Sequence, residues 1–125
     1  MSCMENREFA TQMQIRTKRY ALSVIELVDA LPKTTTGRVI GHQLIRAGTS
    51  VGANYRAACR ARSTAEFSAK LGIVIEEADE CIYWIELIVE GKLMRGDLLQ
   101  PLLQETNELL ATMVTARKTV QQHHS

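Results

Sequence analysis

Proline and aromatic residues are scarce in this chain of 125 residues, and glycine is not abundant either. Two prolines and seven glycines leave long stretches without a strong helix breaker. Aromatic residues make up only 5% of the chain while apolar residues make up 46%, a composition typical of globular domains that excludes collagen-like and disordered classes. Because a chain of this length can bury one core unaided, we expect a single domain over residues 1–125.

Cysteines in paired spacing and long apolar runs are also missing. Cys3, Cys59 and Cys81 are odd in number and form no CxxC pair, which argues against a disulfide framework and a zinc site. The first 19 residues mix charges throughout and lack the apolar core of a signal peptide. No window approaches the roughly 18 apolar residues of a membrane span. We therefore expect a cytoplasmic protein without a membrane partner.

The residue patterns that carry catalysis are absent as well. His42 is the only histidine inside a predicted helix, and no paired-histidine or HExxH spacing occurs. The acidic run over residues 76–80 has most of its carboxylates directed outward, which is a poor arrangement for a cation. Ser50 and Cys59 have no neighbouring base, and no phosphate-binding glycine loop is present. We expect no catalytic residue, no metal and no cofactor, and hence a protein that is not an enzyme.

Apolar residues recur at helical spacing in four segments, and Leu44, Val51, Leu71 and Leu98 are among those expected to face the core. These segments span about residues 4–31, 37–61, 64–90 and 97–121. Pro32 ends the first, Ser63 and Glu66 form a capping-box pattern before the third, and Gly91 ends the third. Four long helices with short connections favour antiparallel neighbours. The predicted fold is all-α, an antiparallel up-and-down four-helix bundle.

Small residues are concentrated in the second predicted helix. Gly41, Gly48 and Gly52 each cost about 1 kcal/mol of helix propensity relative to alanine. We expect them to allow another backbone to approach closely, with residues 48–53 as the point of contact.

The charges of the chain are segregated along the sequence although the formal net charge is only +1. Residues 33–72 hold seven lysines and arginines against one acid, whereas residues 73–90 hold six acids and no lysine or arginine. A nearly neutral molecule has no strong overall field for polyanions. Any electrostatic function must therefore come from these local groups.

Basic residues of the second segment fall on one helix face when projected at about 100° per residue. They are Arg38, His42, Arg46, Arg56 and Arg60. Guanidinium groups suit phosphate because they donate two parallel hydrogen bonds. A solvated arginine-rich face explains the pattern equally well. A third possibility is that these residues pair with outward acids of the third helix, such as Glu76, Glu80 and Glu86, on a second copy.

Two large apolar residues, Ile73 and Trp84, project away from the core face of the third helix, and Glu77 lies near them. Tryptophan is enriched at interface hot spots. We therefore expect Ile73, Glu77 and Trp84 at a subunit interface. The alternative places Trp84 at the edge of the bundle's own core.

Several runs in the middle of the chain carry a family resemblance. They are Leu31-Pro32, the run from Leu44 to Ala58, Ser63 to Phe67, Lys70 to Ile73, and Glu76 to Leu87. In this order and spacing the chain resembles the bacterial four-helix-bundle proteins encoded in intervening sequences of 23S rRNA genes. It is also similar to the accessory variability proteins of diversity-generating retroelements.

The resemblance implies a bundle that assembles as a ring, typically a homopentamer. In the retroelement proteins it also implies binding of RNA and of a reverse transcriptase. The positions that match for nucleic acid are Arg46, Arg56, Arg60 and Lys70. This chain is far less basic than the retroelement proteins, so a reverse transcriptase is expected only if the gene lies in a retroelement.

Residue pattern and resemblance together predict a non-enzymatic, ring-forming bundle that binds RNA or DNA through its second helix. The predicted contact residues are Arg38, His42, Arg46, Arg56, Arg60 and Lys70. The alternative is a structural or protein-partner scaffold in which basic and acidic faces pair between subunits.

Overall fold

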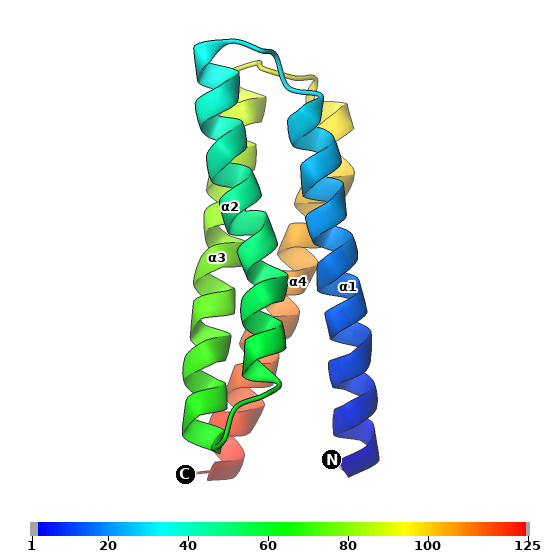
Figure 1. Cartoon of the computed structure of the whole chain (residues 1–125), viewed down its shortest axis with the longest axis vertical. Coiled ribbons are helices and arrows are strands. Elements are labelled where there is room, and N and C mark those ends of the chain that lie inside the picture. Colours follow the sequence, from blue (N-terminus) through cyan, green and yellow to red (C-terminus); the bar gives the residue numbers. More distant parts are fainter. Residues whose placement is uncertain (1–2, 125) are drawn as a thin grey trace.

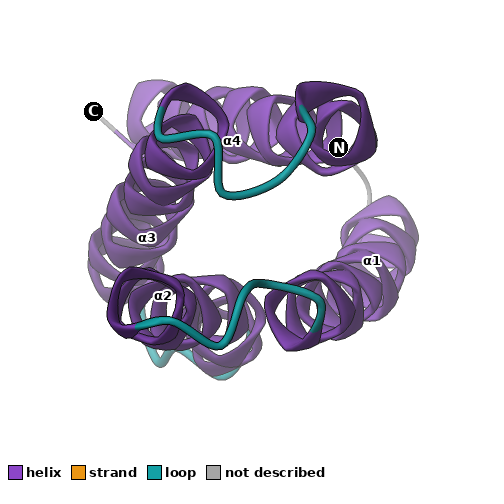
Figure 2. Ribbon diagram, turned by 90° about the horizontal axis from the view of Figure 1, so that it is seen from above, coloured by secondary structure: helices purple, strands orange, loops and turns teal. Residues whose placement is uncertain are grey.

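Four long helices lie side by side in the computed structural model, which describes residues 3–124 and the side chains of residues 7–122 (Figure 1). They are α1 (Cys3–Asp29), α2 (Thr35–Ala58), α3 (Thr64–Glu90) and α4 (Gly96–His124). Consecutive helices run in opposite directions, and both termini lie at the same end. Seen along its axis, the molecule has the helices around a common centre, each beside its neighbours in sequence (Figure 2). The structure confirms the predicted antiparallel four-helix bundle.

Hydroxyl side chains set the starts of the two central helices. Thr34 has an extended backbone, and its hydroxyl accepts a hydrogen bond of 3.1 Å from the amide of Gly37. Ser63 accepts in the same way from Glu66, also at 3.1 Å. Each cap satisfies an amide that has no partner within the helix. Because the cap is Thr34, α2 begins two residues earlier than predicted.

The ends of the helices differ from the predicted bounds by up to three residues. α1 ends at Asp29 and α2 at Ala58. The amides of Ala30 and Leu31 after α1, and those of Arg60 and Ala61 after α2, bond to carbonyls only three residues back and close a turn. α4 extends to His124, beyond the predicted end at residue 121. The side chains of Cys3, His123 and His124 lie outside the described residues.

Gly91 ends α3 as predicted, but it does not adopt the left-handed backbone for which glycine is suited. Gly91 has φ −79°, and the following Lys92 has φ 57°. The amide of Leu93 then bonds back to the carbonyl of Ile88 at 3.0 Å. The turn therefore places its left-handed position on a residue with a β-carbon, where that backbone is strained.

The core follows the predicted helix faces with one exception in α4. Leu44, Val51 and Leu71 are fully buried, as predicted from their spacing. Leu98, expected inside, is 56% exposed, whereas Leu99 is completely buried. The inward face of α4 runs through Leu99, Leu102, Thr106, Leu109 and Met113, whose steps of three and four residues turn Leu98 outward.

The predicted close approach at the glycines of α2 is confirmed. A β-carbon at Gly48 would lie 2.9 Å from both methyl groups of Val24 on α1, and one at Gly52 would lie 3.3 Å from the carbonyl oxygen of Thr17. Ordinary contacts between carbon atoms are about 3.5–4.0 Å. The glycines therefore let α1 and α2 pack more closely than alanine would allow.

One polar pair is buried between α1 and α4. The hydroxyl of Thr106 donates to the carbonyl of Leu102 at 2.7 Å, so its oxygen accepts from the hydroxyl of Tyr20, which lies 2.6 Å away. Burial raises the pKa of Tyr20 well above its ordinary value. Both hydroxyls are satisfied, as buried polar groups require.

Candidate nucleic-acid interface

The basic residues predicted for nucleic acid lie mostly on the outside of the bundle. Arg38, His42, Arg46 and Arg56 of α2 are all exposed, and so is Arg60, which lies in the turn after the helix and not within it as predicted. Lys70, on α3, is half-buried. The four residues of α2 share one face because the inward face of this helix carries Leu44, Ala47, Val51, Tyr55 and Ala58.

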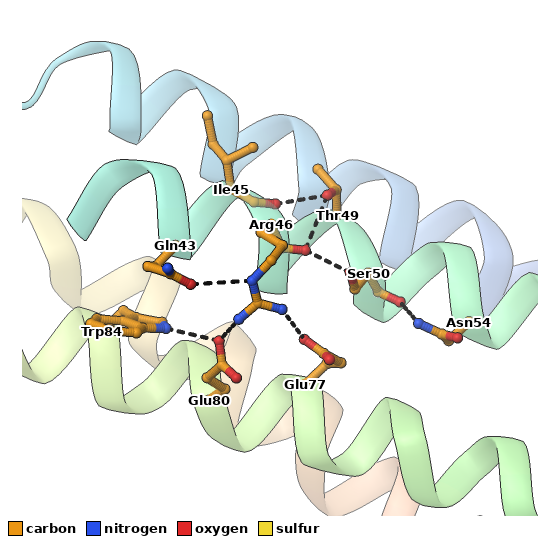
Figure 3. Close-up of polar contacts among 9 residues, drawn as sticks. All are labelled: Gln43, Ile45, Arg46, Thr49, Ser50, Asn54, Glu77, Glu80 and Trp84. Carbon is orange, nitrogen blue, oxygen red and sulfur yellow. Dashed lines mark hydrogen bonds and ion pairs between the residues drawn. The ribbon is translucent and has the colours of Figure 1, made fainter. Parts of the chain in front are cut away.

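Arg46 differs from the other members of this face because it is held by α3 (Figure 3). Its guanidinium forms ion pairs with Glu80 and, at 3.3 Å, with Glu77. Its Nε donates to Gln43 at 3.2 Å, and the indole N–H of Trp84 donates to the same Glu80 carboxylate at 3.0 Å. Arg46 therefore links α2 to α3, and its charge is balanced within the subunit.

The engagement of Arg46 divides the basic face into two groups. Arg38 and His42 lie near the start of α2, and Arg56 and Arg60 lie near its end. At 1.5 Å per residue, the 18 positions from Arg38 to Arg56 span about 27 Å. Within residues 3–124, Arg38, Arg56 and Arg60 form no ion pair. These three guanidinium groups are the ones available to an external anion.

The acids of α3 divide in a similar way. Glu77 and Glu80 are half-buried and engaged by Arg46. Four others are exposed and, within the described part of the chain, form no ion pair; they are Glu76, Asp79, Glu86 and Glu90. Glu76, Glu80 and Glu86 were the acids expected to pair between subunits. Glu80 has its partner, Arg46, in its own subunit.

Of the residues predicted for a subunit interface, Glu77 is paired with Arg46 of α2 and Trp84 bonds to Glu80. Ile73 is 41% exposed, while Trp84 is half-buried and packs against the core. Beside it, Tyr83 is 53% exposed and meets the Trp84 ring edge-on, with 5.1 Å between ring centroids. Tyr83 was not predicted at this interface, although a large aromatic residue next to Trp84 and off the core stripe was a usable signal.

The hydroxyl groups near Arg46 are used locally. Ser50 donates to the carbonyl of Arg46 at 2.7 Å, Thr49 donates to that of Ile45 at the same distance, and Asn54 donates to that of Ser50 at 2.9 Å (Figure 3). Among the described residues, no group of three or more histidine, cysteine or acidic side chains could hold a metal ion. No described helix is long and apolar enough to cross a membrane. The chemistry that this face offers is the binding of anions by exposed guanidinium groups.

Comparisons with known proteins point to one group. The model of a family described as 23S rRNA-intervening sequence protein matches residues 5–115. A crystal structure of a protein of unknown function from the S23 ribosomal protein family of Bacteroides thetaiotaomicron is similar, with a TM-score of 0.81 and 28% identity over 87% of this chain and 97% of that one. No curated protein matches the chain significantly.

Proposed function

Because the chain belongs to the 23S rRNA-intervening sequence protein family, we propose that it is a non-enzymatic helical bundle that binds RNA or another nucleic acid through the basic face of α2. The observation that carries the proposal is the set of exposed guanidinium groups of Arg38, Arg56 and Arg60, none of which has an ion-pair partner within residues 3–124. Guanidinium groups with no internal partner are suited to bidentate contacts with phosphate.

The other predicted contact residues have graded roles in this proposal. His42 lies one turn from Arg38, and its ring N–H can donate a hydrogen bond to phosphate. Lys70 is half-buried and extends the surface onto α3. Arg46 must exchange Glu77 and Glu80 for phosphate, so it contributes less than Arg56 or Arg60. Affinity is thus expected to come mainly from the two ends of α2.

The salt dependence of RNA binding tests the proposal. The triple variant Arg38→Gln, Arg56→Gln and Arg60→Gln should bind a single-stranded RNA more weakly. Its plot of log affinity against log salt should be shallower by about two, since each phosphate contact on a single strand contributes roughly 0.7 to the slope. Fluorescence anisotropy at several salt concentrations measures both quantities.

A matched control separates specific contacts from a loss of overall charge. Lys18, Arg19 and Lys118 are exposed on α1 and α4, and changing all three to glutamine removes the same charge from other faces. This control should keep the wild-type slope. If the α2 variant binds RNA as the wild type does, or if both triple variants lose affinity equally, the proposed face is wrong.

A second candidate is a scaffold whose basic and acidic faces pair between copies. The exposed acids of α3, Glu76 and Glu86 among them, favour it because no cation of the described chain meets them. Then the α2 triple variant should dissociate the assembly. Size-exclusion chromatography with light scattering distinguishes this outcome from lost RNA binding in an intact oligomer.

Assembly as a ring of identical copies, with five subunits by the resemblance, is part of the same proposal. Ile73, Glu77 and Trp84 are its proposed contact residues, and the half-exposed Tyr83 lies beside them. Replacing Ile73 by Glu should lower the mass measured by light scattering and leave helicity unchanged. A reverse transcriptase partner is proposed only for a gene that lies in a retroelement, which its genomic neighbours reveal.

A further inference from the structure

A large cavity opens between all four helices at the end of the bundle that holds the two termini. Its volume is about 950 Å³, which lies within the roughly 300–1,000 Å³ of small-molecule sites. Alanines account for much of this space because their side chains are too short to fill it. They are Ala10, Ala58, Ala61, Ala111 and Ala116. Of the neighbouring helix pairs, α1 and α4 are the least in contact.

The inner and outer parts of the cavity differ in chemistry. Its inner wall is apolar, with Tyr55 almost completely buried and Phe9 and Phe67 half-buried. Its outer lining includes the exposed residues Arg7 and Arg62, together with serines and threonines. No carboxylate lines it among the described residues. The carboxylate of Glu66 is near but not part of this lining, and it accepts a hydrogen bond from the backbone amide of Arg62.

We propose that this cavity binds a single-chain amphiphile with an anionic head, of the medium-chain fatty acid class. An alkyl chain fits against the apolar inner wall, where each buried methylene tightens binding. A carboxylate at the rim meets Arg62, since a guanidinium group forms strong charge-assisted hydrogen bonds with a carboxylate. This site is separate from the exposed face of α2 and does not depend on the function proposed for that face.

Cys59 gives a direct readout because it is half-buried and lines the cavity. Cys81 is completely buried in the core, and a Cys3→Ser background removes the remaining thiol. In that background the rate at which iodoacetamide modifies Cys59, followed by mass spectrometry, reports occupancy. Decanoate, used below its critical micelle concentration, should slow the modification of Cys59, and this protection should reach a plateau as the decanoate concentration rises. Decanoate should bind roughly tenfold more tightly than octanoate because of its two extra methylenes.

The head group is tested with a neutral ligand of equal chain length. Decanol should protect Cys59 roughly tenfold less well than decanoate. The Arg62→Gln variant should lose most of this difference while it still binds decanol. Equal binding of decanol and decanoate by the wild type would overturn the anionic part of the proposal.

Filling the cavity provides the structural test. Ala111→Phe and Ala116→Leu, made separately, should each remove the protection by decanoate while circular dichroism stays that of the wild type. Ala53→Phe, at an exposed alanine of α2 outside the cavity, is the control and should retain protection. The proposal fails if decanoate gives Cys59 of the wild type no saturable protection. It also fails if the filled variants fold like the wild type and decanoate still protects their Cys59 equally well. It also fails if raising the protein concentration alone protects Cys59, because a second copy then occupies the cavity.

Discussion

Substituting Gly48 by alanine should destabilise the bundle although alanine is the better helix former. In an isolated helix the change would be favourable by about 1 kcal/mol. Here the new β-carbon would lie 2.9 Å from both methyl groups of Val24 and 3.2 Å from its β-carbon. Val24 is completely buried and β-branched, so its side chain cannot rotate away from the contact.

The size of the effect depends on the balance between the gain in helix propensity and the cost of the close contact with Val24. Overpacking of a core costs about 1–3 kcal/mol, which exceeds the gain in propensity at most sites. We expect Gly48→Ala to lower the free energy of unfolding by about 1–2 kcal/mol. Urea unfolding followed by circular dichroism, at one protein concentration, measures it. Gly96→Ala is the control, because the nearest atom to its β-carbon would be 3.7 Å away, and it should be neutral or stabilising.

A double-mutant cycle tests the proposed cause. Val24→Ala alone removes two methyl groups and should cost about 2 kcal/mol. Combined with Gly48→Ala, it relieves the clash and lets the added methyl occupy part of the vacated space. The double variant should therefore be more stable than the sum of the single effects by about 1–3 kcal/mol. Additive effects, or a Gly48→Ala variant more stable than the wild type, would refute the close-contact explanation.

Three further predictions concern buried and strained groups. Thr106→Val should lower the free energy of unfolding by about 1–3 kcal/mol because it removes the oxygen that accepts from the buried hydroxyl of Tyr20. Tyr20→Phe should lower it by only about 1 kcal/mol. If urea unfolding ranks the two variants in the opposite order, Tyr20 is not the donor. Lys92→Gly should stabilise the protein by up to about 1 kcal/mol and raise its melting temperature, since glycine tolerates the left-handed backbone. A lower melting temperature in calorimetry contradicts this prediction. Burial raises the pKa of the Cys81 thiol from 9.0 to about 11. The folded state then holds this proton more tightly than the unfolded chain, so its contribution is intact below pH 9 and is lost as pH rises toward 11. In urea unfolding at a series of alkaline pH values, Cys81→Ala should decline less steeply than the wild type, and equal slopes would contradict this.

The number and order of the helices could be predicted from the sequence because apolar spacing and capping residues are local signals. The stripe of α2 and the Ser63 cap of α3 were found in this way. Leu98 was misplaced because spacing alone does not distinguish adjacent residues at the first turn of a helix. The left-handed turn at Lys92 was missed because a neighbouring glycine gave the stronger signal.

The candidate interface was less predictable because it depends on contacts between helices. Projection of a single helix placed Arg46 among the exposed arginines, but only the packing of α2 on α3 brings it to Glu77 and Glu80. The cavity has the same origin, since its walls come from all four helices and from residues as distant in sequence as Phe9 and Thr119. Periodicity reports which face of a helix turns inward and carries no information on what it meets there.

The hydrogen bond between Trp84 and Glu80 gives the protein a built-in optical probe. Trp84 is the only tryptophan of the chain, so tryptophan emission comes from a single known place. The carboxylate that its indole N–H contacts also holds Arg46. If a bound phosphate draws Arg46 away, the surroundings of the indole change. The fluorescence spectrum of the unlabelled protein can therefore reveal whether the middle of α2 takes part when nucleic acid is added.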